Sequence, residues 1–196
     1  MVNGKLGELT KKQKNALDAV IRNSERLNRL IDSLVYLTLV RIGKVKCQVQ
    51  IGQIIDNAVW DISPLVEKKG LTIEKNIPPS LPSINGDEDK ITEVLINLIE
   101  NAIKFTPSGG RITVAVDVEN DNLHITVSDT GIGIPPEYFK SMFQEFYQVD
   151  TSTTRNYSGT GLGLFISKSI IEAHNGNIWA ESKVGIGTTI HLILPK

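Results

Sequence analysis

Residues 97–105 read Asn97-Leu98-Ile99-Glu100-Asn101-Ala102-Ile103-Lys104-Phe105. They lie in a run from Asp87 to Thr106 that begins with an N-capping aspartate and two further acidic residues and is followed by Pro-Ser-Gly-Gly. These are the start and stop signals of a helix. Because residues three and four apart are neighbours on a helix, the run presents one apolar arc made by Ile91, Val94, Leu95, Leu98, Ala102 and Phe105.

Asn97, Asn101 and Lys104 fall together beside that arc. Such a group is usually a solvated polar face of a helix. Two amides that flank a cation can also hold a metal ion and a phosphate together, because an amide carbonyl is an oxygen ligand for Mg²⁺ and the lysine ammonium is a compact positive charge. We favour the second interpretation because three further segments follow in the chain.

Those three segments carry glycines and read Asp129-Thr130-Gly131-Ile132-Gly133-Ile134, Gly159-Thr160-Gly161-Leu162-Gly163-Leu164 and Gly185-Ile186-Gly187-Thr188. A single glycine turn carries little information, since such turns occur in most proteins. In this order, and on different kinds of predicted element, the segments together indicate a nucleotide site built around adenine and a triphosphate bound to Mg²⁺.

Asp129 continues the inward register of the alternating residues Leu123, Ile125 and Val127. A buried carboxylate needs a hydrogen-bond donor. The carboxylate can cap its own Thr130-Gly131 turn, as Asp before Gly often does. We favour a contact with the exocyclic amine of adenine, because guanine would present an acceptor there and be repelled.

The glycines around this residue fit the same hypothesis. Gly131 and Gly133 let the backbone approach the base closely. Thr188 shares the adenine contact only if the fold brings it beside Asp129. On its own, the segment that contains Thr188 is only a hairpin turn.

The segment Gly159–Gly163 opens a predicted helix that runs to His174. Free amides at a helix start form an anion site. The segment lacks the Gly-Lys-Ser/Thr of a P-loop and is not a dinucleotide fingerprint. The preceding residues, Tyr147–Ser158, are interpreted as a lid whose Arg155 reaches the terminal phosphate, with a simple surface loop as the alternative.

The remaining pattern predicts an α+β sandwich of two layers, with a mixed, mostly antiparallel sheet covered on one face by helices. Thr10 and Gln13 have capping-box spacing at the start of a long helix to Arg41, whose apolar stripe needs a partner. The other expected elements are a linker at Gly43–Gln50, a helix at Ile51–Lys69 broken or bent at Pro64, a strand at Leu71–Asn76, a rigid connector at Ile77–Pro82, a hairpin of Arg111–Val118 and Leu123–Asp129, a short helix at Pro135–Phe146, and strands at Asn177–Glu181 and Thr188–Leu194.

Composition excludes several classes of function. The 196 residues have a formal net charge of -1, which gives no electrostatic support for binding nucleic acid. The single Cys47 favours a reducing, cytoplasmic compartment, and no apolar run is long enough to cross a bilayer, so no membrane contact is expected of the chain. His124 and His191 fall on outward strand positions and His174 at a helix end, and none has a cluster at metal-ligand spacing.

The chain resembles the ATP-binding catalytic domain of sensor histidine kinases. The likeness spans Ile51 to Lys196 and includes the N box, the three glycine boxes and a phenylalanine box at Phe143-Gln144-Glu145-Phe146. It implies the Bergerat-type sandwich of gyrase-like ATPases, with ATP and Mg²⁺ as cofactors. By this analogy Asn101 holds Mg²⁺ and Asp129 reads adenine. The analogy also makes Asn97, Lys104 and Arg155 catalytic, and its nucleotide-binding residues include Phe105, Ile134, Gly159, Thr160, Gly161, Leu162, Gly163 and Leu164.

The resemblance also divides the chain into two regions. Residues 1–45 resemble the second helix of the dimerisation and histidine-phosphotransfer hairpin, and residues 46–196 the catalytic domain. The family's acceptor histidine segment does not occur in the sequence, which is either a piece of a longer protein or a protein without an acceptor. The start at Met1-Val2-Asn3-Gly4 favours the first of these.

We therefore expect Mg-ATP binding without self-phosphorylation on the usual histidine. The acceptor histidine would lie in another segment or protomer, and a response regulator would receive the phosphate. A longer parent protein could be anchored in a membrane. Residues 10–41 would form a homodimer. A gyrase- or chaperone-like ATPase is disfavoured because its general-base glutamate position is Asn97 here, and an amide cannot accept a proton from water. A third alternative is that the chain is a non-catalytic nucleotide-sensing or dimerisation module.

Overall fold

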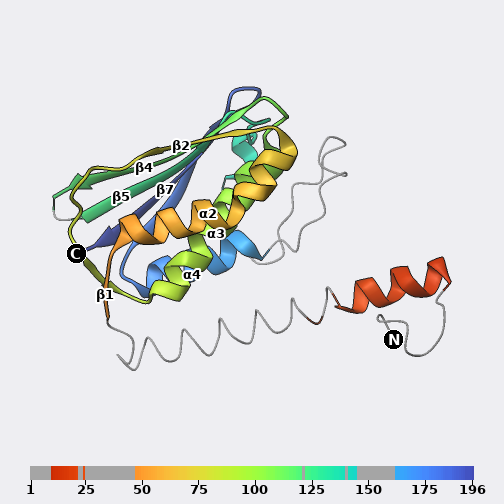
Figure 1. Cartoon of the computed structure of the whole chain (residues 1–196), viewed down its shortest axis with the longest axis horizontal. Helices are drawn as coiled ribbons and strands as arrows, with labels where there is room; N and C mark the ends of the chain where they lie inside the picture. Colours follow the sequence, from red (N-terminus) through yellow and green to blue (C-terminus); the bar gives the residue numbers. More distant parts are fainter. Residues whose placement is uncertain (1–9, 22–23, 25–46, 121, 140, 145–161) are drawn as a thin grey trace.

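Alternating apolar residues build one mixed sheet of five strands in the order β2-β4-β5-β7-β6. Our computed structural model covers residues 1–196 and describes all of them except 1–9, 22–23, 25–46, 121, 140 and 145–161 (Figure 1). β2 (Thr72–Asn76) runs parallel to β4 (Arg111–Glu119), whereas β5 (Asn122–Asp129), β7 (Gly187–Pro195) and β6 (Asn177–Lys183) continue the sheet with antiparallel pairing. The predicted α+β sandwich is confirmed.

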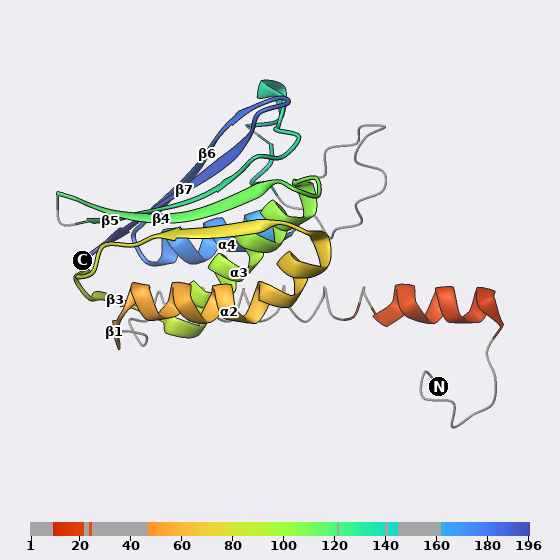
Figure 2. The ribbon, with the colours of Figure 1, turned by 45° about the horizontal axis from the view of Figure 1, so that its top comes forward.

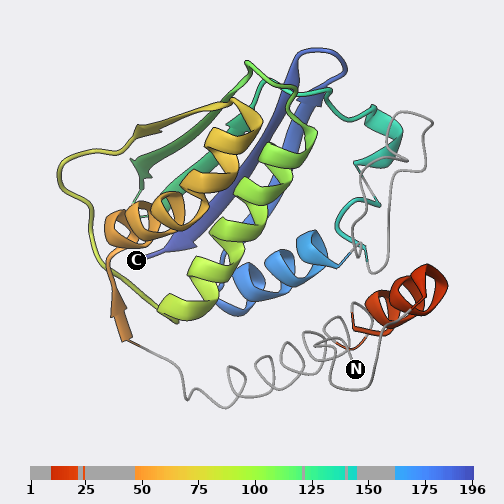
Figure 3. The same ribbon diagram turned by 45° about the vertical axis from the view of Figure 1, so that its right-hand side comes forward.

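Three helices lie on one face of this sheet (Figure 2). They are α2 (Ile51–Lys69), α3 (Glu88–Phe105) and α4 (Gly163–Ala173), and α3 packs between the other two (Figure 3). The sheet residues that face the helices are fully buried, for example Val114, Ile125 and Leu192, at 1% exposure or less. Within the described part of the chain, no helix covers the opposite face of the sheet.

The helix that carries Asn97 begins and ends where the sequence predicted. Asp87 caps it by accepting a hydrogen bond from the Lys90 amide at 3.1 Å, and Thr106 follows its last residue. The predicted arc is wrong at Phe105, which is only half-buried, because Ile99 and Ile103 face the core in its place. The two amides and Lys104 remain beside this corrected arc.

The prediction of α2 is confirmed, but Pro64 does not break it. A proline leaves the carbonyl one turn earlier without its backbone donor. Here the Ser63 hydroxyl donates to that carbonyl, on Trp60, at 2.8 Å. The helix therefore continues to Lys69, and Gly70 ends it in the left-handed conformation with a φ of 64°.

Three predicted boundaries are wrong. Residues 47–49 of the expected linker form β1 (Cys47–Val49), which pairs with β3 (Ile84–Gly86), a strand that the sequence did not indicate. The described part of the expected helix at Pro135–Phe146 is a 3₁₀ turn, η1 (Pro136–Tyr138), followed by turns, because bonds such as Tyr138 to Pro135 close three residues back. The last helix ends at Ala173 and not at His174; among the described residues it begins at Gly163, and the predicted start at Gly159 lies outside them.

The N-terminal helix is described only in part. Residues 11–21 are helical, and Thr10 and Gln13 form the predicted capping box, with the Gln13 amide 3.3 Å from the Thr10 hydroxyl. The Gln13 side chain in turn accepts from the Thr10 amide at 3.0 Å. The rest of the predicted helix to Arg41 and residues 43–46 of the expected linker lie outside the described residues. None of the described helices is both long and apolar enough to span a bilayer.

Candidate functional site

The carboxylate of Asp129 lies at the end of β5 and points to the helix-covered side, as the register predicted. Its Oδ1 atom accepts hydrogen bonds from the Gly131 amide at 2.7 Å and the Thr188 amide at 3.3 Å. Burial raises the pKa of this carboxyl, although the two backbone donors act in the opposite direction. Both described hydrogen bonds go to one oxygen, so Asp129 caps its own turn and still offers Oδ2 to a ligand.

Thr188 lies directly beside Asp129, because the two residues are register partners on the neighbouring strands β5 and β7. Cross-strand partners point to the same face of a sheet. The side chain of Ser182, on β6, completes the group, with its hydroxyl 2.9 Å from that of Thr188. The sequence reached Thr188 only as a condition, and the strand register meets that condition.

The loop after Asp129 is fixed on both sides by backbone hydrogen bonds. The Ile132 amide donates to the Phe105 carbonyl at 3.2 Å, and the Gly185 amide donates to the Ile132 carbonyl at 2.8 Å. A Cβ atom on Gly131 would lie 2.6 Å from the Phe105 carbonyl oxygen. Gly133 has a φ of +71°, and a Cβ there would lie 2.2 Å from the Lys183 carbonyl oxygen. The loop therefore requires glycine at both positions even before a ligand is considered.

Asn97 faces the last helix and not open solvent. Its amide nitrogen donates to the Ser167 hydroxyl of α4 at 2.8 Å. A Cβ on Gly163 would lie only 2.1 Å from its amide oxygen. Asn97 thus ties α3 to the first turns of α4, a contact that the sequence did not predict.

Asn101 lies one turn and Lys104 two turns further along α3, and both are half-buried. The Lys104 ammonium lies 4.8 Å from the centre of the Phe105 ring, and burial lowers its pKa. Lys69 of α2 donates to the carbonyls of Ile103 and Lys104, which places a positive charge at the end of α3. The described residues hold no group of three His, Cys, Asp or Glu side chains arranged for a metal ion. The side-chain amide oxygen of Asn101 stays the predicted oxygen ligand on α3.

The phosphate end of the predicted site is described only from Leu162 onward. Leu162 caps α4 with a side chain that cannot accept a hydrogen bond, so the first amides of α4 have no partner from that residue. Gly163 and Leu164 form the first turn of the helix. The predicted phosphate contacts Arg155, Gly159, Thr160 and Gly161, and the lid at Tyr147–Ser158, lie outside the described residues.

A pocket with a volume of about 340 Å³ lies at this end of the sheet. It is lined by Asp129, Ser182 and Thr188, but also by Glu181 and Thr189, whose side chains lie on the opposite face. The pocket therefore wraps around the end of the β6–β7 hairpin and does not by itself outline a base-binding cavity.

A profile of the family described as histidine kinase-, DNA gyrase B- and HSP90-like ATPases matches residues 86–196. The chain belongs to this family. The methyl sulfide methyltransferase-associated sensor of Methanosarcina acetivorans is 40% identical over 94% of this chain and 19% of that protein. The sensor histidine kinase WalK of Bacillus subtilis is 39% identical over 88% of this chain and 29% of that protein. The chain thus spans well under half the length of both relatives.

The solved structures agree with the family assignment. The nucleotide-free catalytic domain of the histidine kinase ThkA matches with a TM-score of 0.68 and 26% identity, over 77% of this chain and 97% of that one. Full-length ShkA in complex with AMPPNP matches with a TM-score of 0.73, over 98% of this chain and 40% of that one, at 24% identity. The second likeness shows the fold.

The sequence analysis missed two residues of the candidate site in this ATPase-family domain. Ser182 contacts Thr188, and Lys69 contacts the carbonyls of Ile103 and Lys104. Both contacts join segments that are distant in the sequence, and nothing in the local sequence of either residue indicates them. The strand register would have revealed Ser182, since it is the cross-strand partner of Thr188.

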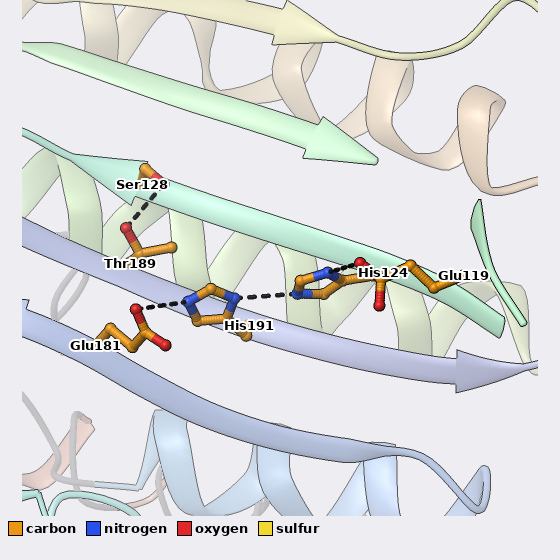
Figure 4. A network of polar contacts seen from close by, with 6 residues as sticks. All are labelled: Glu119, His124, Ser128, Glu181, Thr189 and His191. Atoms are coloured by element: carbon orange, nitrogen blue, oxygen red, sulfur yellow. Dashed lines mark hydrogen bonds and ion pairs between the residues drawn. The ribbon is translucent and has the colours of Figure 1, made fainter. Parts of the chain in front are cut away.

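The three histidines make contacts within the fold. His174 joins α4 to the start of α3, because its Nδ1 lies 2.7 Å from the Ile170 carbonyl and its Nε2 accepts from the Asp87 amide at 3.0 Å. His124 and His191 lie on the open face of the sheet, as predicted, and their rings meet edge to edge with an N–N distance of 3.0 Å (Figure 4).

These two rings form a row across the open face. His124 Nδ1 lies 3.3 Å from Glu119 and His191 Nε2 lies 3.9 Å from Glu181. Trp179 stacks on His191 at 4.8 Å, nearly parallel. Burial lowers the pKa of His191, the charge of Glu181 raises it and His124 lowers it further. His191 Nε2 is buried and has no hydrogen-bond partner among the described residues.

Proposed function

We propose that this chain is the ATP-binding catalytic part of a sensor histidine kinase, and that it transfers the γ-phosphate of ATP to a histidine. The observation that carries the proposal is the Asp129 carboxylate, half-buried beside Thr188, whose Oδ2 has no hydrogen bond to a described residue. The loop that follows it is bonded to Phe105, the last residue of the helix that carries two amides and a lysine. The names of the relatives support it, since two of the most similar curated proteins are a sensor and a sensor histidine kinase.

In this proposal Asp129 Oδ2 accepts a hydrogen bond from the exocyclic amine of adenine. Gly131, Gly133 and Ile134 form the wall of the base site, and Thr188 shares the contact. Phe105 lies next to this wall, because its carbonyl is bonded to the Ile132 amide. A carboxylate acceptor admits adenine and repels the oxygen that guanine carries at the same position.

The triphosphate would extend from the base site towards α3 and the start of α4. Asn101 would hold Mg²⁺ through its carbonyl oxygen, and phosphates and waters would supply the other ligands, as Mg²⁺ prefers. Lys104, Arg155 and the amides of Gly159, Thr160, Gly161, Leu162, Gly163 and Leu164 would neutralise phosphate charge. The ion supplies charge neutralisation at the phosphates when bound.

Asn97 decides between phosphotransfer and hydrolysis in this proposal. Its amide is held by Ser167 and cannot take a proton from water, so the site lacks the general base of gyrase-like ATPases at this position. The γ-phosphate would instead go to an imidazole, which is itself a nucleophile and needs no such base. We propose Asn97 as a catalytic and nucleotide-binding residue because it lies beside the first turns of α4, where it contacts Ser167.

The acceptor histidine would come from another segment or protomer, and a response regulator would take the phosphate onward. One similar structure is that of the histidine kinase ThkA in complex with the response regulator protein TrrA. We also propose a homodimer through residues 10–41, with residues 46–196 as the catalytic domain. In the described part of that helix Val20 is 60% exposed and Ile21 is 38% exposed, so its apolar stripe is open to a partner.

A mixing experiment tests the proposal. The chain is combined with a helical hairpin fragment that carries an acceptor histidine, together with Mg²⁺ and ATP labelled on the γ-phosphate. Label on the hairpin supports a histidine kinase. Release of free phosphate supports an ATPase of the gyrase type, and nucleotide binding without either product supports a non-catalytic nucleotide-binding module.

A further inference from the structure

Ser182 holds three segments of the nucleotide site together. Its hydroxyl donates to the Gly187 carbonyl at 2.7 Å and accepts from the Ile134 amide at 2.8 Å. A third contact, at 2.9 Å, joins it to the Thr188 hydroxyl. The residue therefore connects the loop after Asp129 to both strands of the β6–β7 hairpin.

The direction of the third contact follows from counting protons. A serine hydroxyl has one proton and two lone pairs. The proton goes to the Gly187 carbonyl, which can only accept, and one lone pair takes the Ile134 amide. The remaining lone pair must receive the proton of Thr188. The Thr188 hydroxyl is thus turned towards Ser182 and can present only its lone pairs to a ligand.

Asp129 lies beside Thr188 on the same face of the sheet, and its Oδ2 has no hydrogen bond to any residue that the structure describes. Two acceptors then stand next to each other, and no hydroxyl proton points into the site. An amino group, which carries two protons, matches this pair. A carbonyl oxygen in the same place would meet acceptors only.

We infer that Ser182 is a positioning residue that sets the base preference of the site, by keeping the Thr188 hydroxyl as an acceptor and the Gly131–Ile134 loop in place. The inference rests on the proposed function, because it needs a purine nucleotide as the ligand. It gives the β6–β7 hairpin, whose turn contains Gly185 and Gly187, a role in choosing the base. Ser182 acts through Thr188 and does not itself touch the base.

The test compares ATP with inosine triphosphate, which differs in carrying an oxygen in place of the amino group at C6. In the Ser182→Ala variant the Thr188 hydroxyl is free to rotate and donate to that oxygen. We expect ATP affinity to fall by up to about tenfold, because Thr188 and the Gly131–Ile134 loop are no longer held in place, and a misplaced contact with the base can cost as much as roughly one net hydrogen bond. The affinity for inosine triphosphate should fall less, so that the preference for ATP narrows at least about threefold.

Matched variants separate this role from a general loss of structure. Ser128 and Thr189 form a similar hydroxyl pair, at 3.0 Å, between β5 and β7 on the opposite face (Figure 4). Ser128→Ala should leave the preference for ATP unchanged, and Ser182→Thr, which keeps the hydroxyl, should preserve it. Ser182→Cys, with a weak donor of similar size, provides a second probe if the alanine variant does not fold, and it should narrow the preference as well.

An unchanged ratio of ATP to inosine triphosphate affinity in the folded Ser182→Ala or Ser182→Cys variant would overturn the inference. The double variant gives a second way to overturn it. If Thr188→Val narrows the ratio of ATP to inosine triphosphate affinity, and adding Ser182→Ala narrows this ratio further, then Ser182 acts independently of Thr188. If the unmodified chain binds neither nucleotide, the proposed function fails, which is a different outcome from a failed role of Ser182.

Discussion

Placing a methyl group on Gly163 should break the contact between α3 and α4. A Cβ there would lie 2.1 Å from the Asn97 amide oxygen, so the Asn97 side chain must rotate away and give up its hydrogen bond to Ser167. Ser167 is only 1% exposed, so its hydroxyl loses a partner with little access to water. Losing one partner of a buried hydrogen bond costs about 1–3 kcal/mol.

The background variant Asn97→Ala provides the control for Gly163→Ala. Removing the asparagine amide removes the three atoms that lie nearest to the new methyl group, and alanine is a better helix former than glycine. Gly163→Ala should therefore destabilise the unmodified chain by about 1–3 kcal/mol and be neutral or stabilising in the Asn97→Ala background.

The free energy of unfolding is measured for all four proteins by urea titration without nucleotide, followed through tryptophan fluorescence. For a domain of this size, 1 kcal/mol also corresponds to roughly 2–4 °C in Tm. An equal cost of Gly163→Ala in both backgrounds would refute the assignment of Asn97 as a tie between α3 and α4.

Three further predictions follow from the described contacts. The Tm of Gly133→Ala should be well below the Tm of Gly185→Ala. Both glycines have positive φ, but only a Cβ on Gly133 would lie against a backbone carbonyl. Equal Tm values for the two variants would contradict this. Because burial and His124 lower the pKa of His191 from 6.5, the unfolded chain binds more protons below that pH, so stability should fall on acidification. His191→Phe should flatten this dependence in unfolding curves from pH 7 to 5, although Glu119, Glu181 and His124 face the same row. Chelation of Mg²⁺ should weaken ATP binding in calorimetry, and Asn101→Ala should make binding insensitive to the chelator; full magnesium dependence in that variant would exclude Asn101 as a ligand.

Local signals were sufficient for most of the helices and strands. The α3 helix was predicted from its cap and its stop, and the β4–β5 hairpin from alternation, because both depend on neighbouring residues in the sequence. The pair of β1 and β3 was missed because its strands are three residues each and are separated by about 35 positions, so that no periodicity can develop. Phe105 was placed in the core because hydrophobicity alone does not distinguish a core residue from one beside a site.

The residues of the candidate site likewise fall into those that the local sequence predicts and those that it does not. Asp129 was assigned from the period of its strand, which fixes the face to which a side chain points. The contacts of Ser182 and the Asn97–Ser167 hydrogen bond depend on which strands and helices are neighbours. That arrangement is determined by the tertiary structure and not by the local sequence. Proton directions, such as that of the Thr188 hydroxyl, require the complete set of donors and acceptors around a group.

The most direct test of the account is calorimetric titration of Mg-ATP into the chain and into Asp129→Asn. The substitution keeps size and shape but replaces one carboxylate oxygen with an amide NH2 group, which only donates hydrogen bonds. This group either faces the adenine amino group or disturbs the Gly131 and Thr188 amides. We predict binding by the unmodified chain and a loss of at least about tenfold in affinity for the variant, equivalent to 1.4 kcal/mol. Equal affinities for the two proteins would contradict the role of Asp129 as the group that recognises the base.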